Sequence, residues 1–316
     1  MTGRMDGQPP QVVCLLGPTA AGKTETALEL ARHLPLEIVS VDSVMIYRGM
    51  DIGTAKPAAE QLAKAPHHLI DIREPWESYS AGAFARDASA LIDKITARGN
   101  IPLLVGGTFL YFRALQRGLA PLPAGDPELR EELDRRGAAE GWEALHAELA
   151  GVDPEAAARI NPQDRQRIQR ALEVFALSGE PISRLQSRPG RKPERRFLSV
   201  VLEPGDRNQL HKDIENRFRQ MMRAGFLDEV KLLKSIPQLS GDTSAMRAVG
   251  YRQLWRHLLG ELNLEQAESS AIVATRRYAK RQLTWLRSAE AELRLDCQQQ
   301  DVVGPVLEML AQHGFS

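Results

Sequence analysis

One segment near the N-terminus has the residue types and spacing of an anion-binding loop. It matches the phosphate-loop pattern G-x-x-x-x-G-K-[ST] and reads Gly17-Pro18-Thr19-Ala20-Ala21-Gly22-Lys23-Thr24. Glycines let the backbone curl so that several N–H groups point at one anion, and a helix that begins there adds its positive end. Lys23 supplies a charge for terminal phosphate oxygens, and Thr24 supplies a hydroxyl suited to Mg²⁺. The alternative is a chance Gly-rich turn, but the pattern favours a di- or triphosphate ligand of unspecified kind.

Two polar residues follow other predicted strands. Asp42 comes directly after the predicted strand 37–41, and Thr108 follows 101–105 through Gly106-Gly107. Because α/β sheets bind ligands at the carboxyl ends of their strands, we expect both near the phosphate loop. Asp42 then has three interpretations, as a magnesium ligand, as a general base or as a helix-capping or turn residue. Thr108 is either a site residue or a helix cap.

The strand and helix patterns predict the architecture. Short segments at 12–16, 37–41, 101–105 and 197–202 have the pattern of strands, and helical spacing occurs at 23–34 and 84–95. This alternation predicts an α/β fold, a P-loop NTPase-like parallel sheet flanked by helices. The segment from about 119 is charged and helical without a convincing strand. We therefore expect a core of 11–118 plus 197–316 with an inserted all-helical domain at 119–196.

The composition excludes several classes of protein. The 316 residues carry 41 Lys and Arg against 41 Asp and Glu, with only two cysteines, Cys14 and Cys297. A disulfide framework and a cysteine-rich zinc site are excluded. Because no apolar stretch is long enough for a membrane span and the first ten residues lack the apolar core of a secretory signal, we expect a cytoplasmic protein without membrane contact.

Basic residues gather in two runs despite the neutral total. The first run is 184–196, and the second is 276–287, which has no acidic residue. A helix through the second run would place Arg276, Lys280 and Arg287 on one stripe, with Arg277 and Arg281 beside it. Such a stripe suits a nucleic-acid backbone, and its alternative is a solvated helix face. His67-His68 would point to opposite sides of an extended chain, so a structural or RNA-side role is expected rather than zinc binding.

Together with the phosphate loop, seven further segments resemble the bacterial tRNA dimethylallyltransferases. They are 41–47, 51–57, 66–71, 105–108, 161–173, 247–253 and 278–285. The phosphate loop alone is shared with many enzymes, whereas the ordered set is specific and spans roughly residues 11–290.

The resemblance implies a reaction and its residues. A dimethylallyl group would pass from dimethylallyl diphosphate to N6 of the adenine 3′ to the anticodon, in tRNAs reading codons that begin with U, and diphosphate would leave. Asp42 would be the general base and Thr108 would lie at the reacting centre, while Mg²⁺ would be held near Thr24 and Asp42. An arginine would contact the diphosphate. Among Arg217, Arg219 and Arg223, on one predicted helix at 210–223, we favour Arg223.

The resemblance further implies a tRNA anticodon stem-loop clamped by the helical insertion. The implied tRNA-binding residues are Asp42, Ser43, Val44, Met45, Thr108, Arg130, Gln166, Arg167, Ile168, Gln169, Arg170, Arg247, Ala248, Val249, Gly250, Tyr251, Arg252, Lys280, Arg281, Gln282, Leu283, Thr284, Trp285, Leu286 and Arg287. No protein partner is implied, and a monomer is expected.

Two other functions use the same features. A small-molecule or nucleotide kinase would bind ATP at the phosphate loop, with helices of 126–196 as a lid. A non-catalytic RNA-binding protein would use the loop as a nucleotide switch. Dependence on ATP rather than a prenyl diphosphate distinguishes the first, and an Asp42→Ala variant with unchanged function distinguishes the second.

Overall fold

A computed structural model describes residues 11–188 and 194–315. The chain divides into two compact units, one of them Gln116–Pro193 and the other formed by the residues on both sides of that segment. The predicted insertion, 119–196, overlaps the unit Gln116–Pro193.

The larger unit is built on a six-stranded parallel sheet in the order β3-β2-β4-β1-β5-β6. The strands are β1 (Gln11–Leu16), β2 (Leu36–Val41), β3 (His67–His68), β4 (Ile101–Gly106), β5 (Arg196–Glu203) and β6 (Leu293–Asp296). Gly106 pairs with Leu16 on one side and with Val41 on the other. Three neighbouring strands therefore end in one row, and the residues that follow them begin at the same edge. The predicted α/β class is confirmed.

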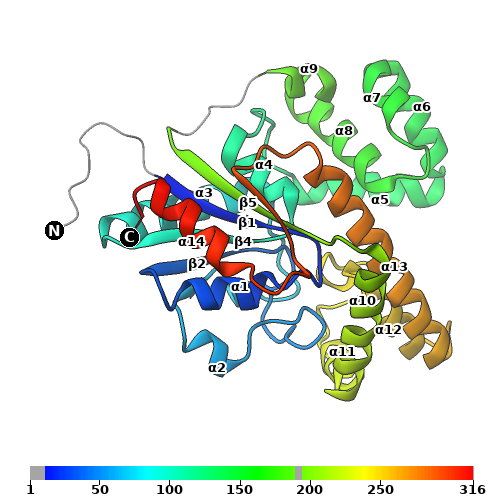
Figure 1. Cartoon of the computed structure of the whole chain (residues 1–316). Coiled ribbons are helices and arrows are strands. Elements are labelled where there is room, and N and C mark those ends of the chain that lie inside the picture. Colours follow the sequence, from blue (N-terminus) through cyan, green and yellow to red (C-terminus); the bar gives the residue numbers. More distant parts are fainter. Residues whose placement is uncertain (1–10, 189–193, 316) are drawn as a thin grey trace. The chain divides into compact units, whose positions relative to one another are not determined.

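Helices cover both faces of the sheet (Figure 1). Val13 and Leu15 of β1 belong to a core shared with α1 (Lys23–Leu30) and α14 (Val303–Gln312). Cys14 and Leu16 belong to the opposite core, shared with α3 (Ala81–Ala97) and α4 (Phe109–Arg117). The alternation follows from the strand period of two, and an apolar residue at nearly every β1 position gives a strand buried on both faces.

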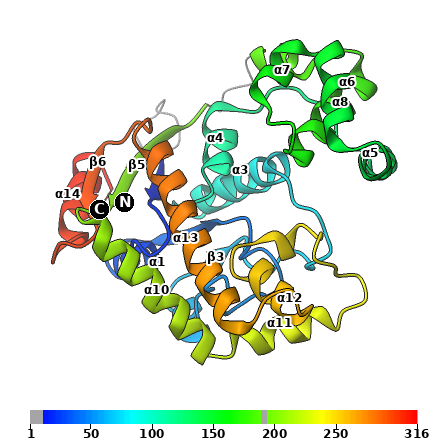
Figure 2. The same ribbon diagram turned by 90° about the vertical axis from the view of Figure 1, so that its right-hand side faces the viewer.

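A third cluster of helices lies beyond the carboxyl edge of the sheet (Figure 2). It contains α10 (Arg207–Arg223), α11 (Phe226–Lys234), the 3-10 helix η1 (Ala245–Arg247), α12 (Tyr251–Leu258) and α13 (Leu264–Leu286), while the short α2 (Ala59–Leu62) stands apart. Their apolar faces surround Phe226 and Tyr251, which are fully buried.

The smaller unit is helical throughout the residues that the structure describes. It consists of α5 (Pro127–Ala139), α6 (Trp142–Val152), α7 (Pro154–Arg159), α8 (Arg165–Ser178) and α9 (Ile182–Ser187). Glu173 is fully buried in it and accepts hydrogen bonds from Arg130 at 2.7 Å and from Arg170 at 2.5 Å. Burial alone would raise the pKa of Glu173, but these two guanidinium groups outweigh it and lower the pKa.

The structure differs from the sequence-based expectations at two elements. The helix expected at 23–34 ends at Leu30, and turns carry the chain to Leu34. β6 was not predicted, because its four residues alternate apolar and charged side chains at the sheet edge and give only a short pattern. Across the described ranges, no helix is long and apolar enough to cross a membrane.

Candidate active site

A cavity of about 1030 Å³ opens at the carboxyl edge of the sheet. Its wall includes the phosphate loop from Thr19 to Thr24, Asp42 after β2 and Gly106-Gly107 after β4. Helices α10 and α13 contribute the opposite wall. The residues predicted to gather at this edge therefore do so, because β1, β2 and β4 end in register.

Lys23 is the first of two cations in the cavity. Its Nζ donates a hydrogen bond to the carbonyl oxygen of Pro18 at 2.6 Å, which folds the side chain back over the loop. Burial, reinforced by the nearby charge of Arg217, lowers the pKa of Lys23 to about 8, while Asp42 opposes the shift. An anion in the cavity would relieve this like-charge repulsion, which is what a binding site for phosphate groups requires.

Arg217 is the second cation, and its position corrects the preference for Arg223. Asp213, Arg217 and Gln220 face the cavity along α10 at helical spacing. Arg223 lies six residues after Arg217, is exposed and does not line the cavity. Arg219 is also exposed and pairs with Glu215 at 2.6 Å. Burial lowers the pKa of Arg217, while Glu25 and Asp42 act in the opposite direction.

Asp42 lines the same cavity and also holds a turn. Its Oδ1 accepts hydrogen bonds from the backbone N–H groups of Val44 at 2.8 Å and Met45 at 3.1 Å. Within the described residues Oδ2 has no hydrogen-bond partner. The turn interpretation and the site interpretation are therefore both compatible with this geometry, since one carboxylate oxygen fixes the loop and the other is available.

Thr108 and Tyr278 lie beside Asp42. The Thr108 hydroxyl oxygen accepts a hydrogen bond from the backbone N–H of Ser43 at 3.2 Å, next to the cavity rather than in its lining. Tyr278 lines the cavity from α13. Burial, followed by the charge of Asp42, raises the pKa of Tyr278 to about 12, and a hydrogen bond with Thr108 partly offsets the rise. Tyr278 was not predicted as a site residue, although it lies four residues before Gln282 on one helix face.

Gln282 is a correction to the predicted tRNA contacts. Its side chain is only 4% exposed, accepts a hydrogen bond from the Thr19 N–H at 2.9 Å and donates one to the Gly107 carbonyl oxygen at 3.0 Å. A Cβ on Gly107 would overlap this amide, so a larger residue there would displace the Gln282 side chain. Gln282 therefore ties α13 to the phosphate loop, and its side chain is almost fully buried.

The donors for a divalent cation are few. The Thr24 hydroxyl and the Asp42 carboxylate line the same cavity. No group of three or more His, Cys, Asp or Glu side chains suited to a metal occurs among the described residues. Oxygen donors of this kind fit Mg²⁺, which keeps several waters and binds mainly through one or two protein oxygens and substrate phosphates.

The two adjacent histidines are held separately, as expected for an extended chain. The His68 Nε2 lies 2.7 Å from Oε2 of Glu37, a carboxylate that also pairs with Arg98. His67 lines the cavity, and its Nδ1 lies 2.7 Å from the Ala65 carbonyl oxygen. The arrangement gives His68 a structural role.

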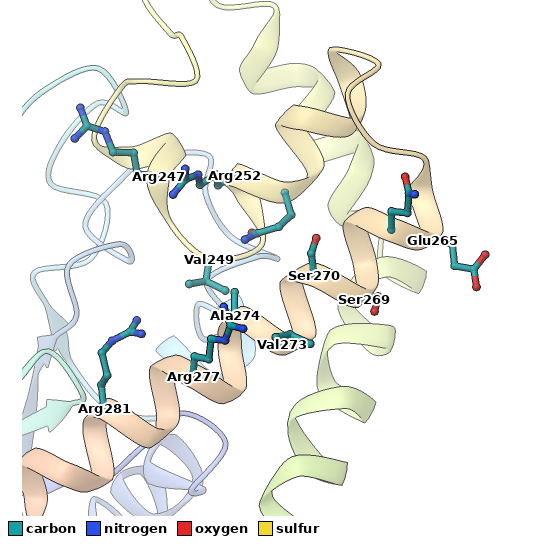
Figure 3. A pocket seen from close by; sticks show the side chains of 12 residues that line it. Arg247, Val249, Arg252, Glu265, Ser269, Ser270, Val273, Ala274, Arg277 and Arg281 are labelled. Carbon is teal, nitrogen blue, oxygen red and sulfur yellow. The ribbon is translucent and has the colours of Figure 1, made fainter. Parts of the chain in front are cut away.

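A second hollow, of about 900 Å³, lies between α12 and α13, and we call it the basic groove (Figure 3). Arg247 and Arg252 enter it from η1 and α12, and Arg277 and Arg281 from α13. Arg276, expected on the same stripe, instead pairs with Glu215 of α10 at 2.8 Å. On α13, Arg277 and Arg281 line the groove whereas Arg276 does not. Arg247 and Arg252, from the segment before α13, complete the basic lining.

Burial divides the predicted tRNA-binding residues. The side chains of Ile168, Tyr251 and Leu286 are fully buried, Gly250 is buried, and Trp285 stacks on Phe109 with ring centroids 4.2 Å apart, so these residues contribute packing rather than an RNA-facing surface. Leu283 is partly buried and packs against the core that β1 shares with α3 and α4. The exposed members are Gln166, Arg167, Arg247, Arg252, Lys280, Arg281, Thr284 and Arg287.

In the helical unit the predicted contacts are partly engaged. Arg130 and Arg170 hold Glu173, and the Gln169 side-chain amide donates to the Arg130 carbonyl oxygen at 3.1 Å. In the first basic run, Arg191 and Lys192 lie outside the described residues, while Arg195 pairs with Asp93 at 2.5 Å. Arg130, Arg170 and Arg195 are therefore paired within the protein, while Gln166 and Arg167 are exposed at the start of α8, where Arg167 pairs with Asp164 at 3.4 Å.

Fold and site together define an α/β protein whose phosphate loop opens onto a cavity beside a basic groove. The model of the IPP transferase family matches residues 45–289. The chain is 52% identical over 310 residues to the tRNA dimethylallyltransferase of Paraburkholderia phymatum, covering 97% of this chain and 98% of the relative. It is 55% identical over 284 residues to that of Stenotrophomonas maltophilia, covering 88% and 90%. The crystal structure of the tRNA isopentenylpyrophosphate transferase of Bacillus halodurans superposes with a TM-score of 0.68 at 37% identity, covering 97% of both chains. The chain belongs to the IPP transferase family.

Proposed function

We propose that this protein is a tRNA dimethylallyltransferase. It transfers a dimethylallyl group from dimethylallyl diphosphate to N6 of the adenine 3′ to the anticodon, in tRNAs reading codons that begin with U, and releases diphosphate. The observation that carries the proposal is the placement of Asp42 in one cavity with Lys23 and Arg217. That cavity joins a base for an amine nucleophile to cations for a leaving diphosphate, and the names of its full-length relatives agree with it.

The leaving group is stabilised by the phosphate loop. The reaction breaks the C–O bond between the prenyl carbon and diphosphate, so negative charge builds on phosphate oxygens. Lys23 and Arg217 lie where that charge develops, together with backbone N–H groups of the loop. Arg217 takes the role that the sequence analysis favoured for Arg223.

Asp42 acts on the nucleophile. An adenine amine attacks poorly because its lone pair is delocalised into the ring. The free Oδ2 of Asp42 accepts the N6 proton as the new C–N bond forms, while Oδ1 stays bonded to Val44 and Met45. General-base help of this kind contributes typically about 10²–10⁴-fold. Thr108 and Tyr278 lie beside Asp42 at this centre.

Thr24 is the proposed protein ligand of Mg²⁺. A Mg²⁺ ion held by the Thr24 hydroxyl would supply further neutralisation of the diphosphate. We assign Asp42 to the base role rather than to the metal, because a carboxylate oxygen bound to a cation accepts a proton poorly.

The RNA lies against the basic groove. Arg247, Arg252, Arg277 and Arg281 suit phosphates of the anticodon stem-loop, while the exposed residues of α8 offer a further polar surface. The target adenine must leave its stack to reach Asp42, which costs a few kcal/mol and less in a loop than in a duplex. Because the proposed substrate is tRNA, we propose a cytoplasmic protein, acting as a monomer.

A kinase using ATP at the same loop is not favoured. Relatives that match this chain over most of its length are named tRNA dimethylallyltransferases. Lys56, which also lines the cavity, is only 5% exposed and is held by Asp51 and Asp71. It is therefore neutralised within the protein and is not a further cation for a γ-phosphate.

The proposal is tested by the release of diphosphate. The protein is mixed with dimethylallyl diphosphate and Mg²⁺, with or without an unmodified anticodon stem-loop RNA. Release that requires the RNA and matches it mole for mole is expected. Release without RNA, or phosphate release from ATP under the same conditions, would remove the proposal.

A further inference from the structure

A buried carboxylate outside the cavity holds one of its walls. Glu229 of α11 is 9% exposed. Its Oε2 accepts hydrogen bonds from the backbone N–H groups of Asp51 at 2.9 Å and Ile52 at 2.7 Å, and its Oε1 accepts one from Gly53 at 3.2 Å. Among the described residues Glu229 has no cationic partner. Hydrogen bonds from three backbone N–H groups and one hydroxyl therefore offset the free-energy cost of burying its charge.

That hydroxyl belongs to Tyr251. Its phenol donates to Glu229 Oε1 at 2.6 Å, within the buried interior. Tyr251 is the first residue of α12, and its chain neighbours Val249 and Arg252 line the basic groove. The Glu229 carboxylate is therefore bonded both to segment 51–53 and to the start of α12, beside the basic groove.

The segment 51–57, which we call the cavity loop, forms part of the wall of the cavity at the phosphate loop. Asp51, Ile52, Thr54, Ala55, Lys56 and Pro57 of this loop line the diphosphate cavity. Its backbone is pressed against the aromatic cluster, because a Cβ on Gly53 would overlap the rings of Phe226 and Tyr251. Phe226 meets Tyr251 edge to face, with centroids 4.8 Å apart. The cavity loop cannot shift without moving Tyr251 or breaking its bonds to Glu229.

We propose that Glu229 and Tyr251 are positioning residues that couple the diphosphate cavity to the basic groove. The inference rests on the proposed function and adds a property to it. RNA bound against Arg247 and Arg252 orders the start of α12, Tyr251 and Glu229 transmit that order to the cavity loop, and the donor then binds a wall already set in place. By reciprocity, donor binding favours RNA binding by the same factor.

The test measures this factor with non-reacting ligands. The dissociation constant of an anticodon stem-loop RNA is measured with and without saturating inorganic diphosphate and Mg²⁺, on the full chain. For the wild type we expect tighter binding with diphosphate by at least about fivefold, the lower end of ordinary couplings. Tyr251→Phe removes only the phenolic hydroxyl and leaves three backbone bonds to Glu229, so the factor should fall to within twofold of one while diphosphate binding alone is retained.

Glu229→Gln tests the carboxylate itself. The amide accepts through one oxygen only, so it cannot reproduce both bonded pairs, and the factor should fall as in Tyr251→Phe. Asp228→Asn is the matched control, because this neighbouring carboxylate is exposed and bonds only Lys231. It should keep the wild-type factor. Thermal unfolding of each variant checks that loss of coupling is not loss of fold.

Hydrogen exchange supplies a second readout, which does not need a diphosphate ligand. RNA alone should slow amide exchange in the cavity loop of the wild type and leave it unchanged in Tyr251→Phe. A wild-type factor of one, or an unchanged factor and unchanged protection in Tyr251→Phe, would overturn the inference. Prenyl transfer by the wild type in either case would leave the proposed function standing, whereas its absence would remove that function separately.

Discussion

Replacing Asp42 by asparagine separates its two functions in the structure. The Oδ1 atom bonds the backbone N–H groups of Val44 and Met45, and an asparagine oxygen can accept the same two bonds. The side-chain NH₂ then stands in place of Oδ2 and cannot accept a proton. Asp42→Asn should therefore keep the turn, the fold and RNA affinity, and lower the rate of the chemical step by at least about a hundredfold. A hundredfold corresponds to ~2.7 kcal/mol of transition-state stabilisation.

The assay is single-turnover transfer from dimethylallyl diphosphate to stem-loop RNA, with RNA binding measured in parallel. Asp42→Ala is the companion variant, because it also loses both turn bonds, worth about 0.5–1.5 kcal/mol each. It should unfold at a lower temperature than Asp42→Asn while being no more active. Turnover of Asp42→Asn within a few fold of the wild type would refute the general-base assignment.

Three more predictions concern the cations. Lys23 must be protonated to attract diphosphate, so donor affinity measured by calorimetry should be level below pH 8 and weaken as pH rises through the lowered pKa of about 8, and Lys23→Met should abolish this dependence. Arg217→Ala should weaken donor binding by about tenfold or more, the scale of a charged hydrogen bond, whereas Arg223→Ala should stay within about twofold; equal effects would return the role to Arg223. Replacing Arg277 and Arg281 together by alanine should reduce the slope of log RNA affinity against log salt by about 1.4–1.8, and an unchanged slope would exclude the basic groove as the phosphate-binding surface.

Much of the sheet was predictable because its strands are buried on both faces. The runs at 12–16, 37–41 and 101–105 are mostly apolar, with only Glu37 and Ser40 polar, and each is followed by Gly or Asp, so both the strands and their carboxyl ends could be placed. The common edge followed from the parallel arrangement. β6 could not be predicted from so short a pattern.

The site was less predictable where it depends on which side of a helix faces the cavity. The sequence pattern does not distinguish Arg217, Arg219 and Arg223 of α10, and only the packing of α10 against α13 turns Arg217 toward the cavity. The same limit applies to α13, where Tyr278 and Gln282 face the phosphate loop while Arg281 faces the basic groove. Glu229 lies far along the chain from Gly53, and nothing in the sequence pattern joins them.

Mass analysis of nucleosides tests the central claim most directly. Unmodified tRNA is incubated with the protein, Mg²⁺ and dimethylallyl diphosphate, beside a reaction given ATP instead, and is then digested. The account predicts a dimethylallyl adduct on the adenosine 3′ to the anticodon with the prenyl donor and none with ATP alone. Absence of the adduct, with ATP consumed or a phosphate transferred, would show that the phosphate loop serves a kinase and would contradict the account.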